Sequence, residues 1–373
     1  MPTLISRIAR AFFRGVAAES FPIAALRATR SLRAYTLGDS IAEVFDNPCY
    51  VAHRRAVADH DEVFFLSHRN FLVHGLTVRE RAMAARHHYA HELVSFDRSY
   101  FDAVYGSGGG LVLWSDRAGD DIFEIVLQPG CDVLYEGGCS LVMRQNGQRT
   151  CVISYSYVPP GLFCPEVPSE QMPASPSVIL VTRRHATVDH SYQKAFNQAF
   201  DRATVGHMCF AALTGVATAQ GFDFVIGMAA AHHPSRTAAN SRHLDAAYDE
   251  FWSSLNGTVP SKFGFRVQVP MQLSPLAEMN ARHRKRASAR RSHLHAVHAS
   301  ARRILANRRV DSGSAALEQR AGFPGASAPA SEAPAAGTHR EDPATGSRRS
   351  CVVELPPPAG PLTTRGDTAR SVS

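Results

Sequence analysis

Two apolar runs, and the helical pattern between them, are the strongest hydrophobic signal in this chain. Residues 177–182 and 222–228 are apolar almost throughout, which is typical of strands whose two faces are both covered. Two short helices are expected between the runs. The second has small and apolar side chains on one face, at Met208, Ala211, Ala212, Val216 and Ala219, and Gly221 supplies the left-handed residue that ends such a helix. The pattern predicts a crossover of the βαβ type.

The segment before the crossover has the pattern of antiparallel strands. Short apolar strands separated by turn residues fill residues 111–157. The clearest local signal is Asn146-Gly147, because this pair accepts the positive φ angles of a type I′ hairpin turn. A final strand is expected over residues 263–269. A meander followed by a crossover predicts an α+β architecture with one mixed sheet.

Helical patterns flank the expected sheet on both sides. Residues 23–105 are mostly helical in pattern, and Thr77 with Glu80 forms a capping box before a helix over 78–93. An amphipathic helix is expected over 244–255. The glycine run at 106–110 precedes a strand and not a helix N-terminus, so it predicts a flexible entry into the sheet and not a phosphate-binding loop.

The positive charge is concentrated in one segment. The net charge is +7, yet ten Lys and Arg residues and no acid lie between Arg282 and Arg309, and the remainder has 30 basic and 33 acidic residues. A basic helix is expected over 275–309. Its candidate polyanion-binding residues are Arg282, Arg284, Lys285, Arg286, Arg290 and Arg291. The alternative is a solvated face without a partner.

The two ends of the chain are expected to lie outside the folded domain. In residues 1–22, Arg7, Arg10 and Arg14 fall on one side of an amphipathic pattern, which suits an anionic membrane surface or a terminal helix docked on the core. Residues 311–373 are rich in Ala, Pro, Gly and Ser with few large apolar residues, which predicts a disordered tail. A single domain is expected over 23–310.

Cysteine and histidine usage predicts neither disulfides nor a metal site. The seven cysteines include no Cys-x-x-Cys pair, so free thiols in a reducing compartment are expected. His87 and His91 stand one helical turn apart, but no third ligand is identifiable, and polar packing explains such a pair. No window reaches the roughly 18 apolar residues of a membrane span. A cytoplasmic protein is expected, with peripheral attachment to the inner membrane as a variant.

Several short stretches resemble the VirK/YbjX family of bacterial proteins, which is linked to virulence and envelope stress. They are His88-Tyr89 and residues 134–137, 179–183, 213–227, 247–252 and 283–291. The resemblance spans about residues 25–300 and implies an accessory role in envelope maintenance, with no agreed enzyme activity or cofactor. Members resembling this chain carry Gln-Gly where it has His185-Ala186, so a ligand held there would be bound differently.

Three functions follow as hypotheses. The first is a VirK-like accessory protein that contacts a protein partner or an anionic surface. The second is an acyl-coenzyme A-dependent acyltransferase, because the order of elements is similar to that of Gcn5-type N-acetyltransferases; Arg183 would contact phosphate, and His185 or His232 would be the general base. Residues 183–190 lack the glycine of the pyrophosphate loop in those enzymes. The third is nucleic-acid binding by the basic helix. Whether the protein is an enzyme stays open.

Overall fold

The computed structural model describes most of residues 38–310. The described ranges are 38–56, 71–130, 137–165, 176–186, 190–273 and 275–310, with isolated residues Ala9, Phe13, Phe21, Pro22, Ala25 and Thr29. All of them belong to one compact unit. The candidate membrane-surface residues Arg7, Arg10 and Arg14 and the expected tail 311–373 lie outside the described residues. None of the described helices is long and apolar enough to cross a membrane.

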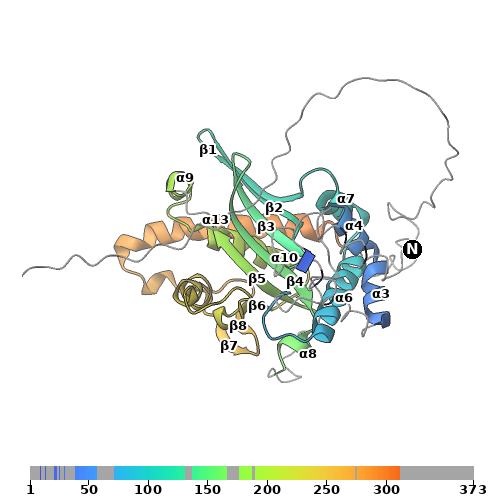
Figure 1. Ribbon diagram of the computed structural model, residues 1–373. Helices are drawn as coiled ribbons and strands as arrows, with labels where there is room; N and C mark the ends of the chain where they lie inside the picture. The colour runs from blue at the N-terminus through green and yellow to red at the C-terminus, as the bar shows by residue number, and fades with distance from the viewer. Residues whose placement is uncertain are drawn as a thin grey trace, which may run out of the picture. The chain divides into compact units, whose positions relative to one another are not determined.

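A mixed sheet of eight strands forms the centre of the molecule (Figure 1). Its spatial order is β1-β2-β3-β4-β5-β6-β8-β7. The strands are β1 (Leu111–Ala118), β2 (Asp121–Pro129), β3 (Cys139–Gln145), β4 (Gln148–Val158), β5 (Val178–Ala186), β6 (Phe224–Met228), β7 (Thr258–Ser261) and β8 (Gly264–Gln268). Neighbouring strands are antiparallel except β5 and β6, which are parallel. The α+β prediction, with a meander joined to a crossover in one sheet, is confirmed.

The β3–β4 hairpin forms where the sequence predicts it. Asn146 and Gly147 have φ angles of 51° and 77°, and Gln145 pairs with Gln148 across the turn. Both central residues therefore have the positive φ of a type I′ turn. The Asn146 side chain adds two bonds, since its Oδ1 accepts the backbone N–H of Ile122 at 2.8 Å and its Nδ2 donates to Asp121 at 2.7 Å.

The crossover from β5 to β6 contains two helices, as the pattern predicts. They are α9 (His190–Ala199) and α10 (Val205–Ala219). Helix α10 is buried along most of its length, because it packs between the sheet and α13 (Ala281–Ala306). Gly215 allows this close packing, since a Cβ there would lie 2.5 Å from the carbonyl oxygen of His298.

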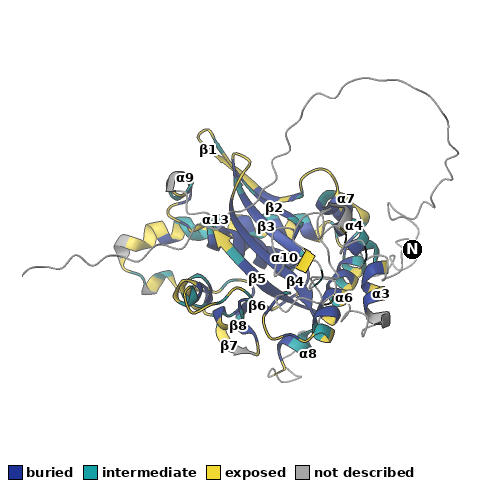
Figure 2. Cartoon of the chain, viewed as in Figure 1, coloured by how far each residue is buried: buried dark blue, intermediate teal, exposed yellow. Residues whose placement is uncertain are grey.

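The N-terminal helices cover one end of the sheet. They are α3 (Gly38–Asp46), α4 (Pro48–Ala56), α6 (Val78–Ser95) and α7 (Arg98–Tyr105). The predicted capping box starts α6: the Thr77 hydroxyl accepts the backbone N–H of Glu80 at 3.2 Å, and the Glu80 carboxylate accepts that of Thr77 at 2.7 Å. Figure 2 shows the side of these helices that faces the sheet as buried. The glycine run enters β1, as expected.

A helix with a π-helical middle follows β6. It consists of α11 (Ser241–Leu244), η4 (Asp245–Asp249) and α12 (Glu250–Ser254), and its apolar stripe is buried as predicted. Gly227 lets Trp252 lie directly on β6, because a Cβ there would come within 2.4 Å of the indole ring. The short strand β7 was not expected from the sequence.

The parallel pair β5 and β6 separates toward the carboxyl end of β5. The two strands pair only from Ile179–Val181 to Val225–Gly227, whereas β5 continues along β4 to Ala186. The backbone N–H of Arg184 donates instead to the Tyr248 hydroxyl, at 3.2 Å. This end of β5 therefore meets the N-terminus of α10 and the helix after β6.

Candidate functional site

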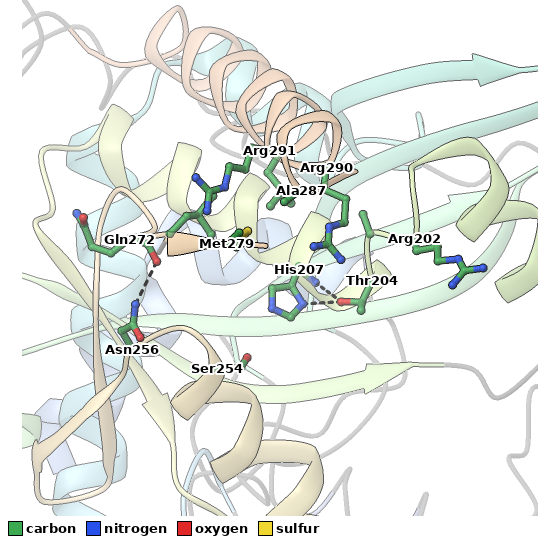
Figure 3. A pocket seen from close by; sticks show the side chains of 13 residues that line it. Arg202, Thr204, His207, Ser254, Asn256, Gln272, Met279, Ala287, Arg290 and Arg291 are labelled. Atoms are coloured by element: carbon green, nitrogen blue, oxygen red, sulfur yellow. Dashed lines mark hydrogen bonds between the residues drawn. The ribbon is translucent and has the colours of Figure 1, made fainter. Parts of the chain in front are cut away.

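A cavity of about 260 Å³ lies at the N-terminus of α10 (Figure 3). Its cationic lining comes from the turn before α10, with Arg202, and from α13, with Arg290 and Arg291. Figure 3 shows Arg290 reaching from α13 toward Thr204 and His207. None of the described residues that line the cavity is acidic.

The N-terminus of α10 lies at this cavity, and Thr204 and His207 are part of its lining. Thr204 is the N-cap, and its hydroxyl accepts the backbone N–H of His207 at 3.2 Å. The helix dipole makes this end partially positive, which favours a bound anion. Gly206 in the first turn leaves room for a neighbouring guanidinium, because a Cβ at this position would lie 2.9 Å from Nη2 of Arg184.

Arg184 is held against this helix end by contacts on three sides. Its Nη1 donates to the carbonyl of Ala247 at 2.8 Å, and its guanidinium lies 4.1 Å from the centre of the Phe251 ring. Its Nε is buried and has no hydrogen-bond partner among the described residues. A cation fixed beside the positive end of a helix is unfavourable alone and favourable when an anion lies between them.

The charge around the cavity also acts on His207. Burial, together with the positive charges of Arg184 and Arg290, lowers the pKa of His207 to about 4. The imidazole is therefore neutral near pH 7. The positive potential of the cavity comes from the arginines and the helix end, and does not depend on histidine protonation.

The turn that carries Arg202 has an unusual backbone. Asp201 and Arg202 have φ angles of 50° and 62°, a region that residues other than glycine rarely adopt. The Asp201 carboxylate lies 3.4 Å from Nε2 of His293 on α13. The strained turn thus places Arg202 at the cavity while tying its neighbour to α13.

The structure separates the residues that the sequence suggested for ligand binding. Arg183 and Arg184 are successive on β5, so they point to opposite faces of the sheet, and only Arg184 reaches α10. His185 is exposed near the end of β5. His232 packs on Phe263 with ring centroids 5.2 Å apart. None of Arg183, His185 and His232 lines the cavity.

The basic residues of α13 fall into two groups, those that line the cavity and those that are exposed. Arg290 and Arg291 line the cavity, whereas Arg284, Lys285 and Arg286 are exposed on α13. The backbone of Arg282 lies in the first turn of α13. Sequence reasoning missed Arg184, Arg202 and His207, which come together only in the tertiary structure. The one local signal was Thr204, an N-cap residue three positions before His207.

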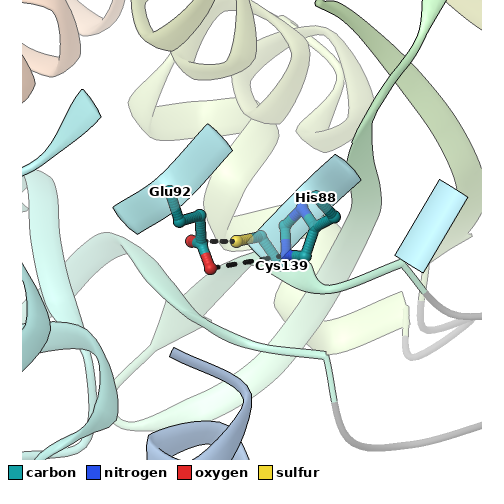
Figure 4. A group of neighbouring side chains, drawn as sticks. All are labelled: His88, Glu92 and Cys139. Atoms are coloured by element: carbon teal, nitrogen blue, oxygen red, sulfur yellow. Dashed lines mark hydrogen bonds and ion pairs between the residues drawn. The ribbon is translucent and has the colours of Figure 1, made fainter. Parts of the chain in front are cut away.

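A second polar group lies in the core, where α6 meets β3 and β4 (Figure 4). His88, Glu92 and Cys139 are buried, and their donor atoms lie within 4.8 Å of one another. The Glu92 carboxylate accepts the hydroxyls of Tyr100 and Tyr105, each at 2.6 Å, and the thiol of Cys139 at 3.3 Å. Burial raises the pKa of Glu92 and holds that of His88 well below its usual range.

The tautomer of His88 argues against a metal at this group. The backbone N–H of Tyr157 donates to Nδ1 of His88 at 3.2 Å, so the proton of the neutral ring lies on Nε2. Nε2 is the atom 3.5 Å from the Glu92 carboxylate, and a protonated nitrogen offers no lone pair to a metal. Nε2 of His88 therefore lies beside Glu92 as a buried N–H group without a hydrogen-bond partner among the described residues.

His87 and His91 are polar packing residues, as the sequence suggested. Nε2 of His91 bonds Oε1 of Gln220 at 2.7 Å, and its Nδ1 bonds the Ser177 hydroxyl at 2.8 Å. Nε2 of His87 bonds the same hydroxyl at 2.8 Å. These bonds join α6 to the start of β5 and the end of α10. The described cysteines are all buried free thiols, namely Cys49, Cys139, Cys151, Cys164 and Cys209.

Comparison with protein-family models, with curated proteins and with solved structures finds no match for this chain. The VirK/YbjX resemblance is therefore still a prediction from short sequence stretches.

Proposed function

We propose that this protein binds a phosphate-bearing ligand of the coenzyme A type in the cavity at the N-terminus of α10. The observation that carries the proposal is the position of Arg202, Arg290 and Arg291 in the lining of a cavity at this helix end, where no described lining residue is acidic. Arg184 adds a positive charge beside the first turn of the helix, outside that lining. Guanidinium groups match phosphate oxygens in a bidentate geometry. Helix amides supply further donors to the same anion.

The position of the cavity in the sheet supports a ligand of this class. The similarity in element order to N-acetyltransferases implies a pyrophosphate on the loop after the fourth strand, before the main helix. We take β5 and α10 as the counterparts of that strand and helix, although one more strand precedes β5 here and α9 lies between β5 and α10. Ligands of α/β sheets commonly bind beyond the carboxyl ends of strands. Acyl transfer is the chemistry that such a cofactor would supply.

Neither candidate general base lies at the cavity. A general base must lie within hydrogen-bond reach of its substrate, and the two candidates, His185 and His232, do not line the cavity. The proposal therefore concerns ligand binding, and acyl transfer stays a prediction. The same is true of the accessory role in envelope maintenance, and of cytoplasmic or inner-membrane location.

Removing the cavity arginines is expected to weaken coenzyme A binding about 10- to 100-fold, because hydrogen bonds between charged groups contribute roughly 1.5–3 kcal/mol. The test is isothermal titration calorimetry of the full chain with coenzyme A and with inorganic pyrophosphate, for the wild type and R290A/R291A. The matched control is R284A/R286A, which removes two exposed charges from the same helix. Equal losses in both variants, or none in R290A/R291A, would contradict the proposal.

A further inference from the structure

The N-terminal half of α13 stands out from the rest of the helix. Residues 281–293, called here the basic arm, have one buried side chain among those described, that of Ala287. The following turns pack Leu294, Val297, Ala301 and Leu305 into the core. Figure 1 shows the arm extending from the body beyond the sheet, and Figure 2 shows most of its surface as exposed.

The positive charges of the arm destabilise its α-helix. Arg284 lies in the first turn of α13, where the helix dipole disfavours cations. The spacing of four residues also sets Arg286 against Arg290. Like charges at this spacing destabilise a helix. Since α13 contains no acid, a bound polyanion would offset these repulsions.

We propose that the basic arm binds the phosphate backbones of duplex nucleic acid, with the helix lying in a groove. Arg284, Lys285 and Arg286 are exposed and consecutive, so at about 100° per residue they cover roughly 200° of the helix circumference. A flat anionic surface meets one side of a helix, whereas a groove has a phosphate row on each side. The major groove of duplex DNA is about 12 Å wide and admits an α-helix.

The residues between the cations fit a groove better than a membrane. Ala281, Ala287, Ser288, Ala289 and Ser292 are small, which lets the helix axis approach its partner closely. Residues 281–293 contain no Leu, Ile, Val, Met, Phe, Trp or Tyr. A membrane-surface helix needs large apolar side chains on one face, and single-strand binding relies on aromatic stacking. Neither feature is present in the arm.

We expect the arm to bind phosphate and to read neither adenine nor cytosine edges. Asn and Gln, which read adenine edges, are absent from residues 281–293, as are Asp and Glu, which read cytosine. Arginine supplies most of the cations and binds phosphate bidentately. The expected signature is an affinity that depends steeply on salt, because each neutralised phosphate releases counterions.

The test measures binding of the full chain to a fluorescent 20-base-pair duplex of arbitrary sequence by anisotropy, over a series of salt concentrations. The triple variant R284A/K285A/R286A is expected to lower the slope of log K against log salt by about 2.7, since each phosphate contact contributes about 0.9. The matched control is R302A/R303A, which removes exposed cations from the C-terminal half of α13 and is expected to leave the slope unchanged.

A second variant separates lost contacts from an unfolded arm. R286E places a carboxylate four residues from both Arg282 and Arg290, which stabilises the helix, and it is still expected to weaken duplex binding at least tenfold. Vesicles of phosphatidylserine serve as the competing surface. An unchanged salt slope in the triple variant, or binding of the arm to vesicles and not to duplex, would overturn the inference.

The two proposals can fail separately. The triple variant leaves Arg290 and Arg291 at the cavity, so it is expected to keep coenzyme A affinity while losing duplex affinity. Loss of both ligands in the triple variant would contradict the separation, within the arm, of the exposed cations at 284–286 from the cavity-lining Arg290 and Arg291. If the wild-type protein binds coenzyme A but not duplex DNA, the proposal for the cavity stands and the proposal for the basic arm is refuted.

Discussion

Gly138→Ala is expected to destabilise the protein by about 3 kcal/mol or more. A Cβ at this position would lie 1.8 Å from Nε2 of His88, and the ring cannot move away easily because it is buried and bonded to the backbone of Tyr157. Close-packed interiors accommodate an added methyl group only by displacing their neighbours. Urea denaturation followed by circular dichroism measures the effect.

Two variants make this experiment specific. Gly108→Ala is the matched control, since nothing lies within 4 Å of a Cβ there, and its effect is expected to stay within about 0.5 kcal/mol. In a double-mutant cycle, H88A is expected to recover part of the loss caused by G138A, because the colliding ring is gone. Additive effects of the two substitutions would show that the collision is not the cause.

Acidification from pH 6.5 to pH 5 is expected to lower the free energy of unfolding through His91. Burial is the main cause that lowers the pKa of His91 to about 4, while an unfolded histidine titrates near 6.5. Between these values the unfolded state binds the proton and the folded state does not. The stability from this residue is therefore complete above pH 6.5 and falls as pH decreases, by about 1.4 kcal/mol per pH unit.

The measurement is the urea midpoint at pH 7, 6 and 5 for the wild type, H91Q and H243Q. H91Q is expected to flatten the pH dependence by about 1.4 kcal/mol per unit between pH 6 and 5. His243, exposed on α11, is the matched control for replacing a histidine by glutamine. His207 and His233 act in the same direction, because the pKa of each is also lowered to about 4. A wild-type slope retained in H91Q would refute the assignment to His91.

Local patterns in the sequence were sufficient for most of the fold. The Asn146-Gly147 hairpin, the Thr77 capping box and the helix over 244–255 each depend on residues close together in the chain. The strand β7 was missed because it has four residues at the edge of the sheet, too few to show a period of two. In the sheet β8 lies between β6 and β7, and no local pattern in the sequence indicates this strand order.

The candidate sites needed the tertiary structure. Arg290 and Arg291 were recognised as basic, but their position at the cavity with Arg202 depends on how α13 packs on α10. Arg183 was preferred to Arg184 because residue type alone does not say which of two neighbours faces the helix. Likewise, Glu92 is one of several acids on helical patterns, and only the fold brings Tyr100, Tyr105 and Cys139 to its carboxylate.

Gly215 lets α13 pack closely against α10. The backbone of α13 comes close to α10 at His298, whose carbonyl oxygen would lie 2.5 Å from a Cβ on Gly215, and the Thr214 hydroxyl bonds the ring of His298 at 3.0 Å. The exposed cations Arg284, Lys285 and Arg286 lie on the same helix as Arg290 and Arg291. A partner bound to these cations would therefore hold the helix that forms one wall of the cavity at the N-terminus of α10.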